Sequence, residues 1–316
     1  MKRAVVIYGP TATGKTDLAL QIAKKYQGEL ISADSRQVYK DLDIGTGKIS
    51  PKSDVIKHQK YWIVDNVKIN GFDLVPPGQM FSVAEFLKFA SGKMSQIRRS
   101  KKLPIVVGGT GFYIKSLIEG LDSLGISPDL KLRKQLENLS VTSLYQKLLQ
   151  INKKRAKTMN KSDRANPRRL IRAIEIGMND KYQVHNKYKI LNAKSLLIGL
   201  TAPNSYLYKR ADNWLEKRLD NGLIEEIQSL VKKGINSDWL ESLGLEYRWL
   251  TRFILGKIGF EKALERLRGD VHSFIRRQKT YFKKFDQIKL FDISKSDWQS
   301  KLEKTVKYWY TTGENG

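Results

Sequence analysis

The chain of 316 residues contains no cysteine and only three histidines. The absence of cysteine excludes disulfide bridges, thiolate nucleophiles and cysteine-ligated zinc, so the fold must depend on side-chain packing alone. The histidines at 58, 185 and 272 are scattered and predict no histidine metal cluster. No apolar run approaches the roughly 18 residues of a membrane span. Because a strand-like segment follows directly after Met1-Lys2-Arg3, we expect a cytoplasmic protein that makes no membrane contact.

Acidic residues are scarce relative to basic ones. The sequence has 58 Lys+Arg against 32 Asp+Glu, a formal net charge of +26. This excess is larger than solubility requires and has the sign that attracts polyanions. Nucleic acid is therefore the leading expected partner, although a membrane surface or an acidic protein would also fit the sign. Hydrophobic residues make up 41% of the chain, which suffices for one large domain or for a core with a smaller appendage.

The N-terminal segment carries the most specific motif. An apolar run, Val5–Tyr8, leads into Gly9-Pro-Thr-Ala-Thr-Gly-Lys-Thr16 and then into a helical pattern. Glycines in this spacing let backbone N–H groups turn toward an anion, and the following helix adds the positive end of its dipole. Lys15 can neutralise a terminal phosphate, and Thr16 can hold Mg²⁺. The motif predicts a phosphate or diphosphate site without naming the ligand.

Hydrophobic periodicity divides the chain into two kinds of region. Six short β-rich runs predict a parallel α/β sheet, with its functional residues at the carboxyl ends of the strands. From about residue 121 to 191 the spacing is helical, and we expect an all-helical insertion there. Residues 1–120 and 192–309 would form a discontinuous core, followed by a flexible tail at 310–316. Between residues 131 and 190 there are 16 Lys+Arg against 4 Asp+Glu, a net charge of +12. The predicted strands are Ala4–Tyr8, Glu29–Ser32, Tyr61–Val64, Pro104–Val107, Ser195–Leu200 and Ile288–Phe291.

Two further segments follow predicted strands and are expected at the same sheet edge as the phosphate loop. Asp34 comes after the second predicted strand, within Asp34-Ser-Arg-Gln-Val-Tyr39. It can act as a general base, bind Mg²⁺ through water, or simply cap the next helix. After the fourth predicted strand comes Gly108-Gly-Thr-Gly111, a turn that exposes backbone N–H groups.

These blocks, together with Asp43-Ile-Gly-Thr46, resemble in order and spacing the tRNA dimethylallyltransferase family of the bacterial type. The resemblance continues through Arg169-Leu-Ile-Arg-Ala-Ile-Glu175, Gly222-Leu-Ile-Glu-Glu226 and Arg276-Arg-Gln-Lys-Thr-Tyr-Phe282, and it covers the chain from Val5 to about Phe285. It implies a P-loop NTPase-like parallel sheet flanked by helices, with an all-helical insertion domain that grips the anticodon stem-loop.

The resemblance also implies an activity, namely transfer of a dimethylallyl group from its diphosphate to N6 of the adenosine 3′-adjacent to the tRNA anticodon. The implied partners are tRNA and dimethylallyl diphosphate, the cofactor is Mg²⁺ on Thr16, and a monomer is expected. Asp34 would accept the amine proton, and Thr11 would lie near the bridging oxygen of the leaving group. The implied diphosphate-binding residues are Gly9, Thr11, Ala12, Thr13, Gly14, Lys15, Thr16, Arg210 and Arg218.

An adenine inside a stacked anticodon loop must be extruded to reach the electrophile. By resemblance, one group of residues faces the flipped base and its neighbours, and a basic helix grips the stem-loop. In that helix, the arginines lie on one face, while Leu170, Ile171 and Ile174 lie on the other. The implied tRNA-binding residues are Asp34, Ser35, Arg36, Gln37, Thr110, Arg133, Arg168, Arg169, Leu170, Ile171, Arg172, Arg277 and Gln278. Gln278 lies in an otherwise apolar stripe, so we expect it to have a polar partner.

The chain departs from the family pattern at several positions. Gly47 replaces the usual alanine of Thr-Ala-Lys-Pro, which should loosen that turn. Trp214 stands where the family has the second of two paired arginines, and Arg218, one turn later, is a candidate substitute. Tyr281 replaces a usual tryptophan, and the customary Gly-Tyr-Lys-Glu reads Gly244-Leu-Glu-Tyr247.

Three other functions share some of these features. A P-loop kinase of a small metabolite or nucleoside would have the loop, the metal and the sheet, but it leaves the net charge of +26 unexplained. A nucleic-acid-binding ATPase would also carry the loop, and a non-enzymatic RNA-binding protein could retain it as a vestige. The sequence leaves open which tRNAs would be modified and whether the donor chain is plain or hydroxylated.

Overall fold

The computed structural model describes residues 3–48, 53–121, 126–179, 190–191, 195–283, 285 and 288–312. The chain forms two compact units, one made of residues 1–118 with 190–316 and the other of residues 119–189.

The flexible tail expected at 310–316 is wrong for residues 310–312, because α14 (Trp298–Thr312) continues through them. Tyr310 packs on Tyr26, with ring centroids 4.6 Å apart. The rest of the expected tail, 313–316, lies outside the described residues.

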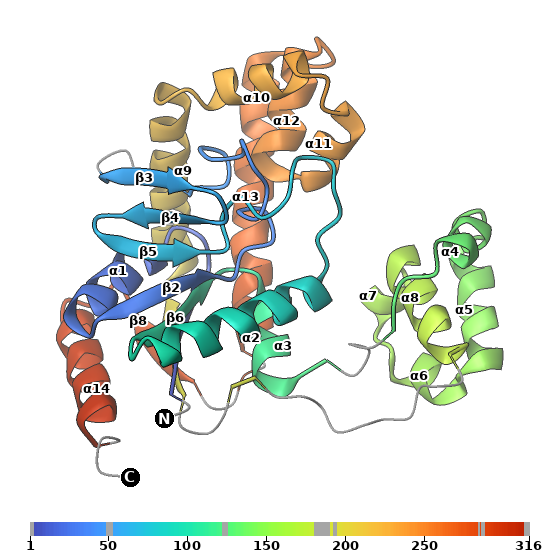
Figure 1. Ribbon diagram of the computed structural model, residues 1–316. Helices are drawn as coiled ribbons and strands as arrows, with labels where there is room; N and C mark the ends of the chain where they lie inside the picture. The colour runs from blue at the N-terminus through green and yellow to red at the C-terminus, as the bar shows by residue number, and fades with distance from the viewer. Residues whose placement is uncertain are drawn as a thin grey trace. The chain divides into compact units, whose positions relative to one another are not determined.

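The first unit is built on a sheet with the strand order β3-β4-β5-β2-β6-β1-β7-β8 (Figure 1). Five of its neighbouring pairs are parallel, and only β3–β4 and β4–β5 are antiparallel. The predicted α/β class with a mostly parallel sheet is confirmed. The strands are β1 (Val5–Tyr8), β2 (Gly28–Ser32), β3 (Val55–His58), β4 (Tyr61–Val64), β5 (Val67–Asn70), β6 (Leu103–Gly108), β7 (Leu196–Thr201) and β8 (Lys289–Asp292).

All six predicted strands form within a residue or two of their expected bounds, and β3 and β5 are additional. The two missed strands are short and contain polar residues such as Lys57 and Lys68, so neither reads as an apolar run. Strand β1 is different, because its four residues are fully or almost fully buried between β6 and β7. A parallel strand covered on both faces needs such a continuous apolar sequence.

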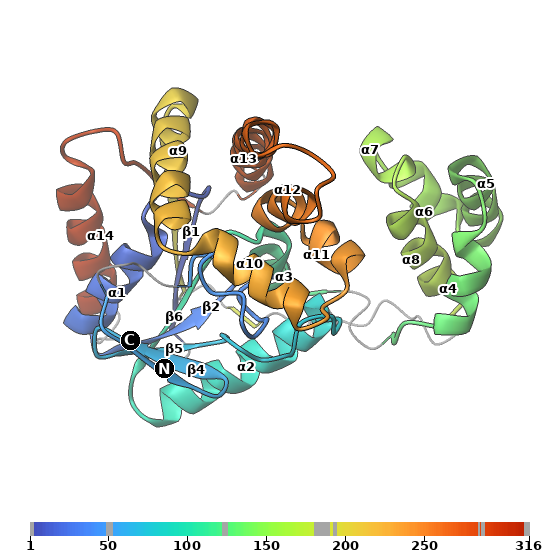
Figure 2. The ribbon, with the colours of Figure 1, turned by 90° about the horizontal axis from the view of Figure 1, so that it is seen from above.

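The helices of the first unit cover the sheet and enclose one of its edges. Helix α1 buries Leu18, Ala19 and Ile22, and α2 starts at a capping box formed by Ser82 and Glu85. Helices α9 and α13 pack against each other, and α12 packs on α13 (Figure 2). The bounds are α1 (Lys15–Lys25), α2 (Val83–Arg99), α3 (Gly111–Glu119), α9 (Asn204–Asp220), α10 (Leu223–Lys232), α11 (Ser237–Leu243), α12 (Leu245–Ile254) and α13 (Phe260–Phe282).

Among its described residues, the second unit contains helices joined by loops and no strand. Asn166 caps α8 by accepting a hydrogen bond from Arg169 N, and Pro167 occupies the first turn, where no backbone donor is needed. Leu136, Leu144 and Leu148 form a small separate core with residues of α8. Across the described parts of both units, no helix is long and apolar enough to span a bilayer. The helices of this unit are α4 (Leu130–Glu137), α5 (Val141–Ile151), α6 (Lys153–Thr158), α7 (Lys161–Arg164) and α8 (Pro167–Gly177).

Candidate active site

The loop between β1 and α1 is closed by hydrogen bonds to its own backbone. Lys15 Nζ and Thr13 Oγ1 both donate to the carbonyl oxygen of Pro10, at 2.7 and 2.8 Å. Gly14 precedes α1 with φ 77°, a conformation that glycine adopts without strain. From α9, Arg210 Nε donates to the carbonyl oxygen of Ala12 at 2.8 Å. The predicted phosphate loop is therefore a compact turn at a helix N-terminus with a lysine and an arginine beside it, the arrangement that binds phosphate groups.

The ammonium group of Lys15 lies in a poorly solvated environment. Desolvation lowers its pKa from 10.5 to about 8, although the carboxylate of Asp34 acts in the opposite direction. Desolvation penalises the charged form because the ion loses water that the protein does not replace. A bound polyanion would reverse this penalty, so the loop is electrostatically prepared for a phosphate ligand.

Gln278 of α13 joins two loops of the site. Its Oε1 accepts from Thr11 N at 3.0 Å, and its Nε2 donates to the carbonyl oxygen of Gly109 at 2.9 Å. The expectation that this buried glutamine needs a polar partner is confirmed. A Cβ at Gly109 would approach Gln278 Nε2 to 2.7 Å, so the close contact requires glycine there. Gln278 thus links the phosphate loop to the glycine turn after β6.

The carboxyl ends of β2 and β6 bring Asp34 and Thr110 together. Thr110 Oγ1 accepts from Ser35 N at 3.0 Å, and Thr110 N donates to the carbonyl oxygen of Ala33 at 3.3 Å. Asp34 Oδ1 accepts from Arg36 N at 2.9 Å. This backbone bond orients the carboxylate and leaves its second oxygen for another donor. Asp34 therefore occupies the position that the order of the strands predicted.

A cavity of about 300 Å³ opens between these segments. It includes many residues singled out in the sequence, among them Thr11, Asp34, Thr110 and Gln278. The apolar wall of the cavity was not predicted from the sequence. Apolar residues at helical spacing are interpreted as part of the hydrophobic core unless their neighbours in the fold are known. The cavity is lined by Thr11, Asp34, Ser35, Arg36, Gly45, Thr46, Gly109, Thr110, Gly111, Phe112, Ala211, Trp214, Arg218, Leu245, Glu246, Val271, Phe274, Arg277, Gln278 and Tyr281.

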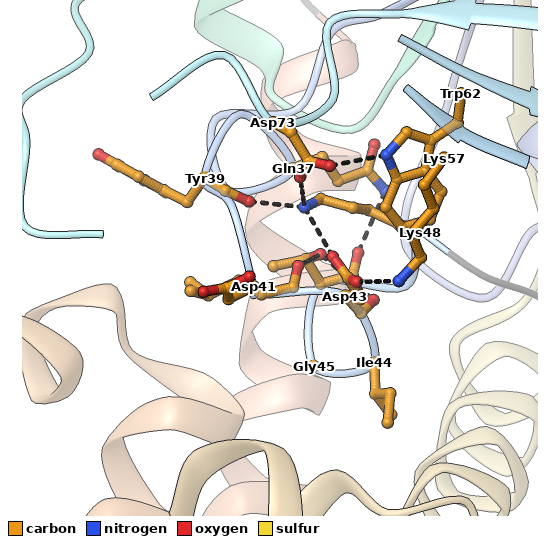
Figure 3. Close-up of polar contacts among 12 residues, drawn as sticks. Gln37, Tyr39, Asp41, Asp43, Ile44, Gly45, Lys48, Lys57, Trp62 and Asp73 are labelled. Carbon is orange, nitrogen blue, oxygen red and sulfur yellow. Dashed lines mark hydrogen bonds and ion pairs between the residues drawn. The ribbon is translucent and has the colours of Figure 1, made fainter. Parts of the chain in front are cut away.

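One rim of the cavity is formed by the loop 43–48, which is fixed by a buried lysine (Figure 3). The side chain of Lys48 has 0% exposure, and its Nζ donates to Asp43 at 2.9 Å, to Asp73 at 2.6 Å and to the Tyr39 carbonyl. Burial alone raises the pKa of Asp43, but the ammonium groups of Lys48 and Lys57 outweigh it and lower that pKa. Despite Gly47, this turn is not loose, because Lys48 secures it, and Gly45 and Thr46 reach the cavity.

The same loop is held from the other side by Glu226 of α10. Its carboxylate accepts from three consecutive backbone N–H groups, those of Asp43, Ile44 and Gly45, at 2.8, 2.6 and 3.1 Å. Tyr247 Oη also donates to Glu226, at 2.8 Å. Hydrogen bonds to an ionised group are about twice as strong as neutral ones, so this carboxylate fixes the loop backbone. The block Gly222–Glu226, seen first as a sequence pattern, therefore shapes the site without lining it.

The predicted role of Arg218 in diphosphate binding needs correction. Its Nη2 donates to Glu246 at 2.8 Å and its Nη1 to the Gly45 carbonyl at 3.0 Å. It follows Arg210 by eight residues of α9, about 12 Å along the helix axis, and its guanidinium is engaged by these two protein groups. Arg218 belongs to the cavity wall, and Arg210 is the arginine at the phosphate loop.

In the second unit, the arginines differ in how strongly they are paired. Glu175, 2% exposed, accepts from Arg133 Nε and Nη2 at 2.6 and 2.8 Å and from Arg172 Nη1 at 3.1 Å. Arg169 pairs with Asp163 at the surface, and Arg168 is exposed. The sequence assignment of α8 is wrong for two residues. Leu170 and Ile171, 0% and 6% exposed, lie in the core of this unit and present no side chain to a partner.

Comparison with known proteins agrees with these features. The family model described as IPP transferase matches residues 37–285. The chain belongs to the IPP transferase family. A tRNA dimethylallyltransferase of Acetivibrio thermocellus is 35% identical over 99% of this chain and 98% of its own. A tRNA dimethylallyltransferase 2 of Phocaeicola vulgatus is 34% identical over 97% of each chain. The crystal structure of a tRNA isopentenylpyrophosphate transferase of Bacillus halodurans is 29% identical, with a TM-score of 0.70, and covers 100% of this chain and 98% of that one.

The family match begins after the phosphate loop and ends just beyond α13. It therefore includes Thr110, Gln278 and Glu226, which holds the loop 43–48, but it does not include Lys15 or Asp34. The chain is a transferase. Its phosphate loop lies outside the matched range, so the loop is an observation independent of the family match. The second unit lies wholly within the match, so the basic helical region is part of the family fold.

Proposed function

We propose that this protein transfers a dimethylallyl group from dimethylallyl diphosphate to N6 of the adenosine 3′-adjacent to the anticodon of tRNA, with release of diphosphate. The observation that carries the proposal is the Gln278 link, which fixes the phosphate loop beside the turn that holds Thr110 and Asp34. Transfer requires a diphosphate cradle and a proton acceptor at one cavity, and Thr11 and Asp34, to which we assign parts in these roles, both line it.

In the proposed reaction, the N6 nitrogen forms a bond to C1 of the dimethylallyl group while the bond from C1 to the diphosphate oxygen breaks. The electron pair of that bond leaves with the diphosphate, and the N6 proton passes to the free oxygen of Asp34. Thr11, Lys15 and Arg210 are placed to stabilise the charge that develops on the leaving group. An exocyclic amine is a poor nucleophile, so holding it near C1 should contribute more than the basicity of Asp34.

Mg²⁺ is the cation that best fits the donor groups. Thr16 supplies a hydroxyl in the first turn of α1, next to Lys15. No cluster of three metal-ligating His, Cys, Asp or Glu residues occurs among the residues with described placement. Such a site suits Mg²⁺, which keeps several waters and is held mainly by substrate phosphate oxygens. When bound, the ion would neutralise charge on the diphosphate, while Thr16 would orient it.

The proposed tRNA contacts fall into two sets. Ser35, Arg36, Thr110 and Arg277 line the cavity and would contact the extruded adenine and its neighbours. In the second unit, Arg168 and Arg169 of α8 are exposed and would contact phosphates of the anticodon stem-loop. Arg133 and Arg172 would support that surface through Glu175. We also propose that the protein acts as a monomer.

A modification assay tests the proposal directly. The protein, Mg²⁺ and an anticodon stem-loop bearing the target adenosine are incubated with dimethylallyl diphosphate or with ATP, and the RNA is analysed by mass spectrometry. We expect one dimethylallyl group on the RNA and released diphosphate with the prenyl donor only. The same stem-loop with the target adenosine replaced by guanosine is the control. ATP consumption with unmodified RNA would instead establish a kinase or ATPase.

A further inference from the structure

The departures from the family pattern, scattered in the sequence, converge at one place in the structure. Trp214 and Arg218 come from α9, Gly47 from the loop after β2, and Glu246 from the start of α12. Three of these four line the cavity, and Gly47 lies directly behind Trp214. These residues therefore belong to one wall of the cavity and can be considered together.

Gly47 and Trp214 depend on each other. Gly47 has φ +66°, and a Cβ built there would lie 2.4 Å from Trp214 Cη2 and 2.7 Å from Cζ2. Real Cβ atoms do not approach another atom so closely, and the positive φ adds strain for any residue except glycine. The usual alanine at 47 and the indole at 214 therefore exclude each other. The glycine is explained by the indole, which needs the space that a methyl group would fill.

Arg218 fixes the ring from another side. Its guanidinium carbon lies 3.9 Å from the centroid of the Trp214 ring. Its charge is balanced by Glu246, and the side chains of this pair are each 6% exposed. Because Arg218 is already paired with Glu246, it is not a free cation for a phosphate. Trp214 is thus held in one orientation by groups that do not compete for the ligand.

The rest of the lining shows which part of a ligand fits this wall. Ala211 shares the cavity-facing side of α9 with Trp214, and Val271 and Phe274 line the cavity from α13. The polar groups Thr11, Asp34, Thr110 and Gln278 come from other segments. Trp214 follows Arg210 by one turn, about 6 Å along α9. A donor whose diphosphate lies on the loop at Arg210 therefore has its short hydrocarbon chain within reach of the indole.

We propose that Trp214 is the residue that holds the hydrocarbon chain of the diphosphate donor and limits its length to five carbons. The inference rests on the proposed prenyl transfer and adds a specificity determinant to it. In this proposal, the wall offers an apolar contact to the group that is transferred. Gly47 and the Arg218–Glu246 pair are the residues that keep the indole in place.

Donor chain length is the first test. Wild type, Trp214→Phe, Trp214→Ala and a distant control, Trp298→Ala on α14, are assayed with dimethylallyl diphosphate and with the ten-carbon geranyl diphosphate. We expect Trp214→Ala to raise the ratio of geranyl to dimethylallyl transfer by about tenfold or more, the ratio that about 1.4 kcal/mol produces. Trp214→Phe should raise it less, and Trp298→Ala should not change it. An unchanged ratio in Trp214→Ala would overturn the inference.

Binding without turnover is the second test. Calorimetric titration compares inorganic diphosphate with the non-transferable dimethylallyl thiolodiphosphate, and thermal unfolding verifies that the variants are folded. Trp214→Ala should lose about tenfold in affinity for the prenyl analogue and less than twofold for diphosphate. Equal losses for both would assign Trp214 to the diphosphate and reject the proposal. Chain-selective binding by a wild type that modifies no RNA would reject the proposed function while leaving this inference intact.

Discussion

The two units use charge in opposite ways. In the first unit, several charges at or near the cavity are paired with one another, as in the Lys48–Asp43–Asp73 group and the Arg218–Glu246 pair. In the second unit, a few acids are outnumbered, and arginines such as Arg168 remain at the surface. Internally paired charge fixes geometry, whereas exposed charge of one sign attracts a polyanion. The comparison predicts that mutations in the first unit alter turnover or folding and that those in the second alter RNA affinity.

The strongest test of this division is Asp34→Asn. The amide still offers an oxygen to Arg36 N but no longer accepts the amine proton, so we expect the turnover number to fall by about 10²–10⁴. Affinity for tRNA should stay within about twofold, because one polar side chain in a large interface contributes little to phosphate binding. Single-turnover kinetics and filter binding measure the two quantities. A parallel loss of affinity would show that Asp34 serves the RNA interface as well.

Lys48→Met tests whether paired charge fixes the cavity rim. Removing the ammonium leaves Asp43 and Asp73 facing each other with little solvent, so the free energy of unfolding should fall by about 3 kcal/mol. Lys57→Met is the matched control. Lys57 also pairs with Asp43, but its side chain is 51% exposed, and its loss should cost less than about 1 kcal/mol. Urea denaturation gives both values, and equal costs would mean that the burial of Lys48 is unimportant.

The second unit is tested by the double variant Arg168→Ala and Arg169→Ala. These exposed residues should contribute phosphate contacts, so tRNA affinity should fall about tenfold at low salt. The slope of log affinity against log salt should become shallower by about 1.4–1.8, while turnover at saturating tRNA changes little. Arg172 is left intact because it supports Glu175. The charge-matched control replaces Lys153 and Lys154 of α6 by alanine. An equal loss of affinity in that variant would show that the arginines act only through their positive charge and not through specific phosphate contacts.

The sequence predicted the fold well wherever one segment carried its own signal. Strand β1 and the phosphate loop were recognisable because a buried parallel strand must be continuously apolar and the loop needs glycines at fixed positions. Strands β3 and β5 were missed, because their residues are half polar and their pairing depends on β4 and β2.

The candidate site was predictable in its polar half and not in its apolar half. Asp34 and Thr110 follow strands, so topology alone placed them together. From the sequence, Trp214 was interpreted as the loss of an arginine and Arg218 as its replacement. Comparison of sequences does not show that these two side chains stack on each other or that Glu246 neutralises Arg218. Leu170 and Ile171 were assigned to RNA through their neighbours in the motif, although their own period places them in the core.

The last prediction is the pH dependence set by Lys15, whose ammonium group is desolvated by burial. With a pKa of about 8 in the folded protein, Lys15 is charged below that pH and loses its proton above it. The specificity constant for the donor should therefore fall by up to tenfold per pH unit above about 8, while the value for tRNA at saturating donor stays flat, because bound diphosphate keeps the lysine charged.

Folding stability responds in the opposite direction. Between about 8 and 10.5 the unfolded chain holds the proton that the folded chain has lost, so this group makes stability rise with pH. Initial rates at limiting donor from pH 6.5 to 9.5, with urea midpoints at each pH, measure both. A donor profile that stays flat through pH 8 would place Lys15 away from the leaving group and leave Arg210 as the basic side chain beside the loop.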